Sequence, residues 1–324
     1  MQGDFNREAY NCLKTIAEVA RDYAGGASEL TGRVAEATLR VVELLPASYS
    51  PETGKTVLTL AETACRAKPH MAPFLRIANS LCLGAEEMDA ARDRESVRRF
   101  QSDFSVLVEK IRTAGAGIRS AAGKLRRELP PSPRLLTYSR SSIVRDLIME
   151  LAGADKNKRI SVIVPESRPG YEGRRLAVEL ADAGCEVISI IDGAISAYLG
   201  EADLVLIGAD SISPEFAVNK IGSRGLAVLA RQDGIPIRIA AETIKFIPEE
   251  LQGVDKSGHN PDQVWEVDHP SLRIENRYFE RIPLGDDIKI ICEEGVLSGN
   301  GIGEMLENLS FCSRLRNWVA GREN

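Results

Sequence analysis

The sequence predicts an all-helical N-terminal domain followed by an α/β domain with a parallel sheet. In residues 6–125 the apolar residues recur at helical spacing, and no strand-like alternation occurs there. From about residue 135 onward, short apolar runs rich in β-branched residues alternate with segments of helical length. Such runs are typical of strands that are buried on both faces of a parallel sheet.

A proline-rich segment marks the predicted domain boundary. Pro130, Pro131 and Pro133 follow one another too closely for a helix to continue through them. A chain of 324 residues is also long enough for two cores. We therefore assign residues 1–128 to the helical domain and residues 129–324 to the α/β domain.

Glycines and prolines divide the helical domain into separate helices. We expect one helix over residues 10–20, a second that Ser28 caps and that reaches Pro46, a third after Pro51, a fourth from Met71 to about Leu83, and a charged helix over 85–125 that breaks near Gly115.

In the α/β domain, six apolar runs are the predicted strands: residues 135–138, 160–164, 187–191, 204–207, 235–240 and 288–292. The predicted helices between them are residues 143–152, 172–183, 194–199 and 217–232. Right-handed crossovers of this kind give a parallel sheet. Ligands of such sheets bind beyond the carboxyl ends of the strands, so the loops after the strands form the candidate site.

Composition excludes several classes of function. A net charge of -6 argues against direct nucleic-acid binding, which needs clustered positive charge. The chain has no apolar run long enough for a membrane span and no apolar leader, so we expect a cytoplasmic protein. The six cysteines form no C-x-x-C pair, and we interpret them as buried free thiols. We expect no metal, because the cysteines and histidines lack zinc-ligand spacing. We also expect no cofactor, because no glycine-rich dinucleotide motif follows a strand.

Two strand-end loops combine charged groups with hydroxyls or a carboxylate. Ser139, Arg140 and Ser141 precede a predicted helix, whose N-terminal N–H groups favour an anion; the alternative is a plain helix cap. After the second strand, Glu166 and Arg168 could hold a sugar hydroxyl and a phosphate. The alternative for this pair is a surface ion pair beside a turn.

The loop after the fourth strand is the third candidate. Asp210 follows a buried apolar run, which is a desolvated position that suits acid–base chemistry. Asn219 and Lys220 come next, and Lys220 could neutralise a phosphate. The alternative makes Asp210 a capping residue and Lys220 a solvated side chain.

The same loops carry the motifs of a known family. The matching stretches are Thr137-Tyr138-Ser139-Arg140, Pro165-Glu166-Ser167-Arg168-Pro169 with Gly173-Arg174, Ala202 to Asp210, Asn219-Lys220-Ile221-Gly222, Leu226 to Ala230, Ala241 to Phe246, and Gly295-Val296-Leu297-Ser298. Here the chain resembles the α, β and δ regulatory subunits of eukaryotic initiation factor 2B. It is also similar to two isomerases of that fold, methylthioribose-1-phosphate isomerase and ribose-1,5-bisphosphate isomerase.

The resemblance implies a Rossmann-like C-terminal domain of the sugar isomerase/CoA-transferase-like kind, a helical domain closing over it, and a ligand between the two. It also implies a homodimer through the C-terminal domains. In the isomerases, a Cys in the first strand-end loop and the Asp of the Gly-Ala-Asp motif are catalytic. Asp210 matches that Asp, and Asn219 and Lys220 match the family's substrate-holding pair.

Three positions depart from the isomerase pattern. Ser139 stands at the position of the catalytic Cys, and a serine hydroxyl is a far weaker acid than a thiol. Gly25-Gly26-Ala27 replaces Arg-Gly-Ala, which removes a guanidinium. Lys68-Pro69-His70 replaces Arg-Pro-Thr, so Lys68 keeps the positive charge without the bidentate fork.

We therefore expect an initiation factor 2B-like protein that binds a sugar phosphate or nucleotide and has weak or absent isomerase activity. The expected roles are phosphate neutralisation by Arg140, Arg168, Lys220 and Lys68, hydroxyl binding by Glu166 and Asn219, contact with the anion at the helix start by Ser141, and contact with the reacting end of the ligand by Asp210 and Ser139. One alternative is an active aldose–ketose isomerase on a ribose 1-phosphate-type substrate. Another is a regulatory subunit of a translation initiation factor.

Overall fold

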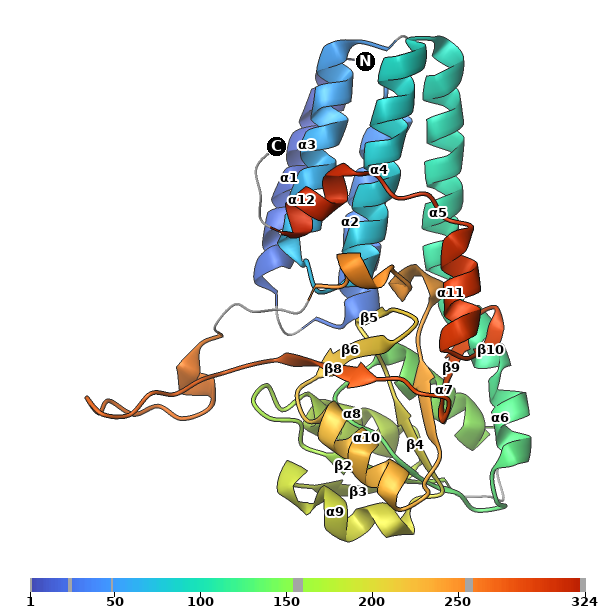
Figure 1. The fold of residues 1–324 in the computed structure, drawn as a ribbon, viewed down its shortest axis with the longest axis vertical. Helices are drawn as coiled ribbons and strands as arrows, with labels where there is room; N and C mark the ends of the chain where they lie inside the picture. The colour runs from blue at the N-terminus through green and yellow to red at the C-terminus, as the bar shows by residue number, and fades with distance from the viewer. Residues whose placement is uncertain (1, 23–24, 48, 154–159, 254–258, 321–324) are drawn as a thin grey trace. The chain divides into compact units, whose positions relative to one another are not determined.

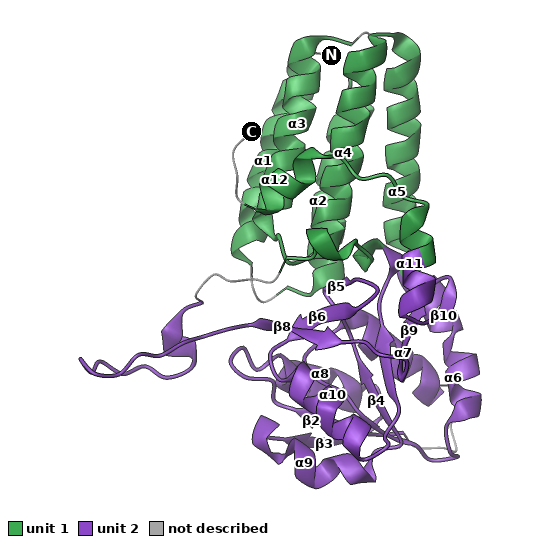
Figure 2. Ribbon diagram, in the orientation of Figure 1, with its two compact units in different colours: residues 1–114, 244–253, 304–324 green, residues 115–243, 254–303 purple. Residues whose placement is uncertain are grey.

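The computed structural model describes residues 2–22, 25–47, 49–153, 160–253 and 259–320. Two compact units make up the chain, and Figure 2 colours them separately. The helical unit contains residues 1–114, 244–253 and 304–324, and the sheet unit contains residues 115–243 and 254–303. This grouping does not test the predicted boundary between two independently folding domains at residue 128, which stays a prediction.

The helical unit is a bundle of long helices with a short C-terminal helix against it (Figure 1). Its elements are α1 (Gln2–Arg21), α2 (Ala27–Glu43), α3 (Pro51–Ala67), α4 (Ala72–Ala91), most of α5 (Arg94–Ser120), the helical turn η4 (Glu249–Leu251) and α12 (Arg314–Val319). Helices α3 and α4 pack along each other, as α1 and α2 do. Buried side chains such as Phe5, Ile16, Phe74 and Phe104 form one continuous apolar core.

The predicted helices are present, but several of their ends differ from the prediction. The second helix begins at Ala27 with Gly26 as its N-cap, so Ser28 is not the cap. The fourth helix continues to Ala91, where Arg92 takes a left-handed conformation and ends it.

The charged helix α5 does not break near Gly115. It passes through Gly117, where a Cβ atom would lie 2.7 Å from Cβ of Glu293. The glycine therefore serves a close approach of the helix to the loop after β9 rather than a helix end.

The sheet unit is built on one seven-stranded sheet in the order β10-β9-β7-β4-β1-β2-β3. Its strands are β1 (Arg134–Leu136), β2 (Ser161–Pro165), β3 (Glu186–Ile190), β4 (Leu204–Ile207), β7 (Ile237–Ala240), β9 (Ile288–Cys292) and β10 (Gly295–Leu297). All neighbouring pairs are parallel except β9 and β10. The predicted α/β fold and its six strands are thus confirmed.

The helices of this unit connect the strands. They are α6 (Ala122–Glu128), α7 (Ser142–Gly153), α8 (Glu172–Asp182), α9 (Ile195–Tyr198), α10 (Ser223–Gln232) and α11 (Gly299–Glu307), with short helical turns at Asp192–Ala194, Leu199–Glu201, Thr243–Lys245 and Pro261–Gln263. Between residue 259 and strand β8 the chain projects from the sheet unit as an arm (Figure 1), and every residue from Pro261 to Arg273 is exposed.

A second, antiparallel sheet overturns one predicted helix. It contains β5 (Ser211–Ile212), β6 (Phe216–Lys220) and β8 (Phe279–Pro283), with β6 in the middle. The helix predicted over residues 217–232 is therefore wrong for its first residues. Residues 217–220 are all buried, because β6 is paired on both edges, and α10 begins only after Gly222, which has a φ of 102°.

Two of the six cysteines are not free thiols, contrary to the prediction. Cys82 and Cys312 form a disulfide, although 230 residues separate them in the sequence. Cys12, Cys65, Cys185 and Cys292 are buried and free, as predicted. Among the described residues, no helix combines the length and the apolar character that a membrane crossing requires.

Candidate functional site

The candidate site lies where the order of the central sheet reverses. Strand β1 has β2 on one side and β4 on the other, and the chain runs from β1 through β2 and β3 before it returns to β4. At such a switch point the loops after the two central strands leave in opposite directions and open a crevice, which is where open α/β sheets bind ligands.

The loops after β1 and β4 touch at this switch point. A Cβ atom on Gly208 would lie 2.8 Å from Cβ of Ser141, so only glycine permits this approach. Ser141 directly precedes α7, and its hydroxyl accepts a hydrogen bond from the N–H of Val144 at 3.4 Å. Two residues after Gly208, the N–H of Asp210 donates to the carbonyl of Val218 on β6 at 2.8 Å, so Asp210 lies where the two sheets meet.

The loops after β1 and β2 are hydrogen-bonded to each other. Ser139 has a φ of 65° and its N–H donates to the hydroxyl of Ser167 at 2.8 Å. Ser167 has a φ of 61°, is fully buried, and donates its hydroxyl to the carbonyl of Pro165 at 3.2 Å. The left-handed conformations are uncommon for residues other than glycine, so this pair of loops is held by its neighbours.

Asp192 holds the second loop from the end of β3. Its two carboxylate oxygens accept the backbone N–H groups of Ser167 and Arg168, both at 2.7 Å. Burial and a hydrogen bond with Asp192 raise the pKa of the Tyr138 hydroxyl. Asp192 was not among the predicted site residues. It nevertheless directly follows the third predicted strand, in the same position at which the other candidate residues follow their own strands.

Lys220 is buried in an ion pair on the second sheet. Its ammonium lies 2.7 Å from Oε1 of Glu172, in the first turn of α8, and 4.3 Å from the ring centroid of Tyr278. The side chain of Lys220 is only 4% exposed. Asn219 is buried next to it and donates its Nδ2 to the hydroxyl of Ser223 at 3.0 Å. Lys220 is therefore not a solvated side chain, which was the alternative for this residue. A desolvated ammonium needs a partner such as the carboxylate of Glu172.

Glu166 and Arg168 do not pair with each other. Oε2 of Glu166 accepts a hydrogen bond from Arg174 at 2.5 Å. Arg168 donates one guanidinium nitrogen to the hydroxyl of Tyr171 and the other to the carbonyl of Val264, at the base of the arm, at 2.6 Å. The surface ion pair that was the alternative for Glu166 and Arg168 is absent.

The remaining predicted residues lie elsewhere. Arg140 forms an ion pair with Glu179 of α8, with 2.8 Å between Nη2 and Oε1. Lys68 ends α3 in the helical unit, where its ammonium donates to the carbonyl of Asp22 at 2.9 Å.

An internal carboxylate occupies the N-terminus of α10. Oε1 of Glu280, on β8, accepts the N–H groups of Gly222 and Arg224 at 2.6 and 2.9 Å. This is the favourable place for a negative charge on a helix. The negative charge at this helix end is therefore supplied by the chain itself.

The model of the initiation factor 2 subunit family matches residues 13–299 of this chain. The chain belongs to the initiation factor 2 subunit family. The match spans most of the chain, so the predicted family membership is confirmed.

Relatives in this family differ in their activities. A ribose 1,5-bisphosphate isomerase of Haloterrigena turkmenica is 30% identical over 74% of this chain and 72% of its own length. The crystal structure of translation initiation factor eIF-2B from Pyrococcus horikoshii has a TM-score of 0.68 and 28% identity, covering 89% of this chain and 96% of its own. The 5-methylthioribose 1-phosphate isomerase of the same organism has 19% identity and a TM-score of 0.66, covering 91% and 87% of the two chains, and shares the fold.

Proposed function

We propose that this chain binds a phosphorylated small molecule, a sugar phosphate or a nucleotide, at the strand-end loops of the sheet unit. The observation that supports this best is the buried Lys220, which Glu172 and the Tyr278 ring hold in place beside the switch point. An ammonium has three N–H donors, and one of them is directed at Glu172. An ammonium held in this way can donate to a phosphate oxygen without further ordering of its side chain.

The proposed roles divide between charge and hydroxyl recognition. In addition to Lys220, we assign phosphate neutralisation to Arg140 and Arg168, hydroxyl binding to Glu166 and Asn219, and contact with the phosphate at the start of α7 to Ser141. Asp210 would contact a ring hydroxyl or the carbonyl end of the open chain. Arg140 and Glu166 already carry ion-pair partners, Glu179 and Arg174, so a ligand would share or exchange these contacts.

We propose that isomerase activity is weak or absent, because the first loop carries Ser139. Moving hydrogen between C1 and C2 of a sugar needs an acid and a base, and a serine hydroxyl is a poor source of either without activation. We further propose that the protein is cytoplasmic. We also propose that it forms a homodimer through its sheet unit, and light scattering of the purified chain would show whether it is a dimer.

A thermal-shift screen tests the binding proposal. The panel holds pentose and hexose phosphates, nucleoside monophosphates, unphosphorylated ribose and inorganic phosphate. A ligand that binds only the folded chain raises the melting temperature, and the rise grows as its concentration exceeds the dissociation constant. We expect a shift with a phosphorylated member and none with ribose alone. No shift with any phosphorylated compound would contradict the proposal.

An active aldose–ketose isomerase is the second candidate. It is favoured by the similarity to a ribose 1,5-bisphosphate isomerase and by Asp210, which keeps the motif residue. In that case Asp210 supplies one proton-transfer role and Ser139 or a water molecule supplies the other. The purified chain would convert an aldose 1-phosphate to the ketose, and Asp210→Asn would abolish the conversion. Turnover that survives in Asp210→Asn would remove Asp210 from the mechanism.

A translation-factor regulatory subunit is the third candidate, favoured by the similarity to the Pyrococcus horikoshii factor. Its main work would be contact with other proteins. Co-purification of the tagged chain with initiation factor 2 from its own host would support this role, and recovery of the chain without that factor would count against it.

A further inference from the structure

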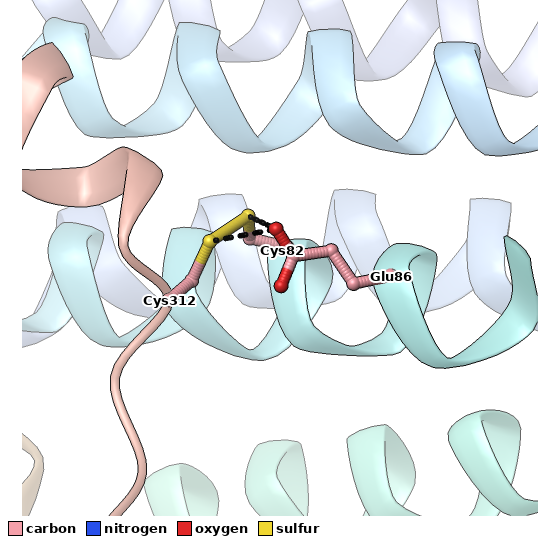
Figure 3. A group of neighbouring side chains, drawn as sticks. All are labelled: Cys82, Glu86 and Cys312. Carbon is pink, nitrogen blue, oxygen red and sulfur yellow. Dashed lines mark hydrogen bonds between the residues drawn. A yellow bond between two sulfur atoms is a disulfide. The ribbon is translucent and has the colours of Figure 1, made fainter. Parts of the chain in front are cut away.

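Two cysteines from distant parts of the sequence meet in the helical unit. Cys82 lies on α4, and Cys312 lies in the segment between α11 and α12 (Figure 3). Their Cα atoms are 6.2 Å apart, within the range that a disulfide spans. Both are buried, at 0% and 2% exposure, so the pair belongs to the packed interior of the unit.

Asn79 holds the backbone of the second cysteine against α4. Its Oδ1 accepts the N–H of Cys312 at 2.8 Å, and its Nδ2 donates to the carbonyl of Ser310 at 2.8 Å. Asn79 lies one helical turn before Cys82 on the same face of α4. These hydrogen bonds do not depend on the sulfur–sulfur bond, so we expect the two sulfurs to stay opposite each other when reduced.

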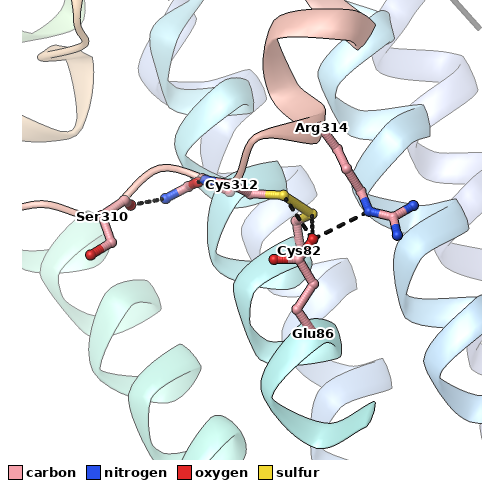
Figure 4. The surroundings of a disulfide bond; sticks show 6 residues. Cys82, Glu86, Ser310, Cys312 and Arg314 are labelled. Atoms are coloured by element: carbon pink, nitrogen blue, oxygen red, sulfur yellow. Dashed lines mark hydrogen bonds and ion pairs between the residues drawn. A yellow bond between two sulfur atoms is a disulfide. The ribbon is translucent and has the colours of Figure 1, made fainter. Parts of the chain in front are cut away.

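A carboxylate and a guanidinium complete the cluster. Oε1 of Glu86, one turn after Cys82, lies 3.5 Å from Sγ of Cys312 and 3.9 Å from Sγ of Cys82. Nε of Arg314 donates to the same oxygen at 3.2 Å (Figure 4). The side chains of Glu86 and Arg314 are 41% and 44% exposed, so charged groups link the buried sulfurs to the surface. The carboxylate can accept a thiol proton, and the guanidinium favours a thiolate.

We propose that Cys82 and Cys312 form a redox-active dithiol that hydrogen peroxide oxidises and a small dithiol reduces. The thiol of Cys312 gives its proton to Glu86, and its sulfur attacks one peroxide oxygen. The oxygen–oxygen bond breaks, which leaves a sulfenic acid and, with the proton from Glu86, one water. The sulfur of Cys82 then attacks the sulfenic sulfur, and the disulfide forms with loss of a second water. Two thiols lose two electrons, and one peroxide gains them.

Oxidation fastens the C-terminal helix to the bundle. Helix α12 packs against α3, α4 and η4, and it buries Leu315 and Trp318. The disulfide joins the start of this segment to α4 and closes a covalent loop across the 230 residues between the two cysteines. A loop of this length strongly restricts the unfolded chain, so the oxidised form is expected to melt at a higher temperature than the reduced form.

Thiol counting and peptide mapping test the proposal. The chain is reduced with dithiothreitol, freed of reductant, and treated with hydrogen peroxide at increasing concentrations. The expected result is a fall from six reactive thiols in the denatured chain to four, with a cross-linked peptide containing Cys82 and Cys312. Dithiothreitol should restore six. A count that stays at six, or cross-links between other cysteines, would overturn the proposal.

Two variants sharpen the comparison. Cys312→Ser should show no cross-link and no peroxide-dependent rise in melting temperature. Cys65→Ser is the matched control, because Cys65 is a buried free thiol in the same unit. It should still lose two thiols to peroxide.

A third variant tests the proton acceptor. Glu86→Gln should slow oxidation by about tenfold or more and change its pH profile. Glu87→Gln, at the next residue, should not. Equal rates in both variants would remove Glu86 from the reaction.

A metal site is the competing outcome. Within the described parts of the chain, Cys82, Glu86 and Cys312 are a group whose ligand atoms gather within 4.8 Å. The reduced chain is therefore titrated with zinc alone. Stoichiometric zinc uptake that Cys82→Ser abolishes, together with resistance of the loaded protein to peroxide, would replace the redox role with a metal-binding role.

Discussion

Lys220 and Glu172 form a buried ion pair with 2.7 Å between Nζ and Oε1, and the pair joins strand β6 of the small sheet to the first turn of α8. The ring of Tyr278, the residue directly before β8, lies over the ammonium. The pair therefore fixes a positive charge beside the switch point of the central sheet.

Lys220→Met is expected to destabilise the chain by about 3 kcal/mol, because it leaves the carboxylate of Glu172 desolvated without its cation. The double variant Lys220→Met with Glu172→Gln should recover much of this loss. Urea unfolding measures both. Arg99→Ala, which breaks an exposed pair with Glu87, is the control and should cost less than about 1 kcal/mol. Equal losses in Lys220→Met and Arg99→Ala would show that the buried pair is not special.

Asp192→Asn is expected to loosen the loops after β1 and β2. Asn keeps one acceptor oxygen but loses the charge and the second acceptor, so Ser167 and Arg168 compete for it. We expect a loss of about 1–3 kcal/mol in the free energy of unfolding. Hydrogen exchange should show faster exchange at the N–H groups of residues 167 and 168. Unchanged exchange at both positions would exclude Asp192 as the support of this loop.

Gly222→Ala is expected to destabilise the sheet unit by about 2 kcal/mol or more. Gly222 has a φ of 102°, and a Cβ atom there would lie 2.4 Å from the hydroxyl oxygen of Tyr138. Gly225→Ala in the same helix is the matched control, because its Cβ would meet no atom within 4 Å. It should stabilise the chain slightly, by about 0.5–1 kcal/mol. Thermal unfolding measures the change in stability of each variant. A similar change in both would contradict the requirement for glycine at position 222.

Alkaline pH is expected to weaken the helical unit through Cys65. Burial raises the pKa of this thiol from 9.0 to about 12. The folded chain therefore holds the proton more tightly than the unfolded chain, so this stabilisation is complete below pH 9 and is lost as the pH rises toward 12.

Cys65→Ala should flatten the fall in unfolding free energy above pH 9 by up to about 1.4 kcal/mol per pH unit. Denaturant unfolding at several pH values measures this slope. Val57→Ala removes buried volume from the same core without a titrating group, so its slope should match the wild type. A Cys65→Ala slope equal to that of Val57→Ala would be inconsistent with the raised pKa.

The sequence predicted the central sheet well because its strands are buried on both faces and read as continuous apolar runs. The loops after those strands could be selected for the same reason, and Ser141 does lie against Gly208 where two of these loops come together. Strand β6 was mistaken for the start of a helix. Its partner β8 follows it only after about sixty residues, so no local pattern marks this pairing.

Contacts between distant segments account for the other differences. Glu172 and Tyr278 reach Lys220 from α8 and from the end of the arm, and no local pattern marks them. The pairing of Cys82 with Cys312 was missed for the same reason, since cysteine spacing alone does not reveal a bond across 230 residues. Asp192 is the exception, because its place after β3 was visible in the sequence.

Calorimetric titration with the best ligand from the thermal-shift panel tests the central claim most directly. Wild-type chain, the charge-neutral double variant Lys220→Met with Glu172→Gln, and the exposed-lysine control Lys124→Met are compared. We predict binding by the wild type, affinity weakened by about tenfold to a hundredfold in the double variant, and unchanged affinity in Lys124→Met. Equal affinity in all three proteins, or no binding by the wild type, would contradict a phosphorylated-ligand site at Lys220.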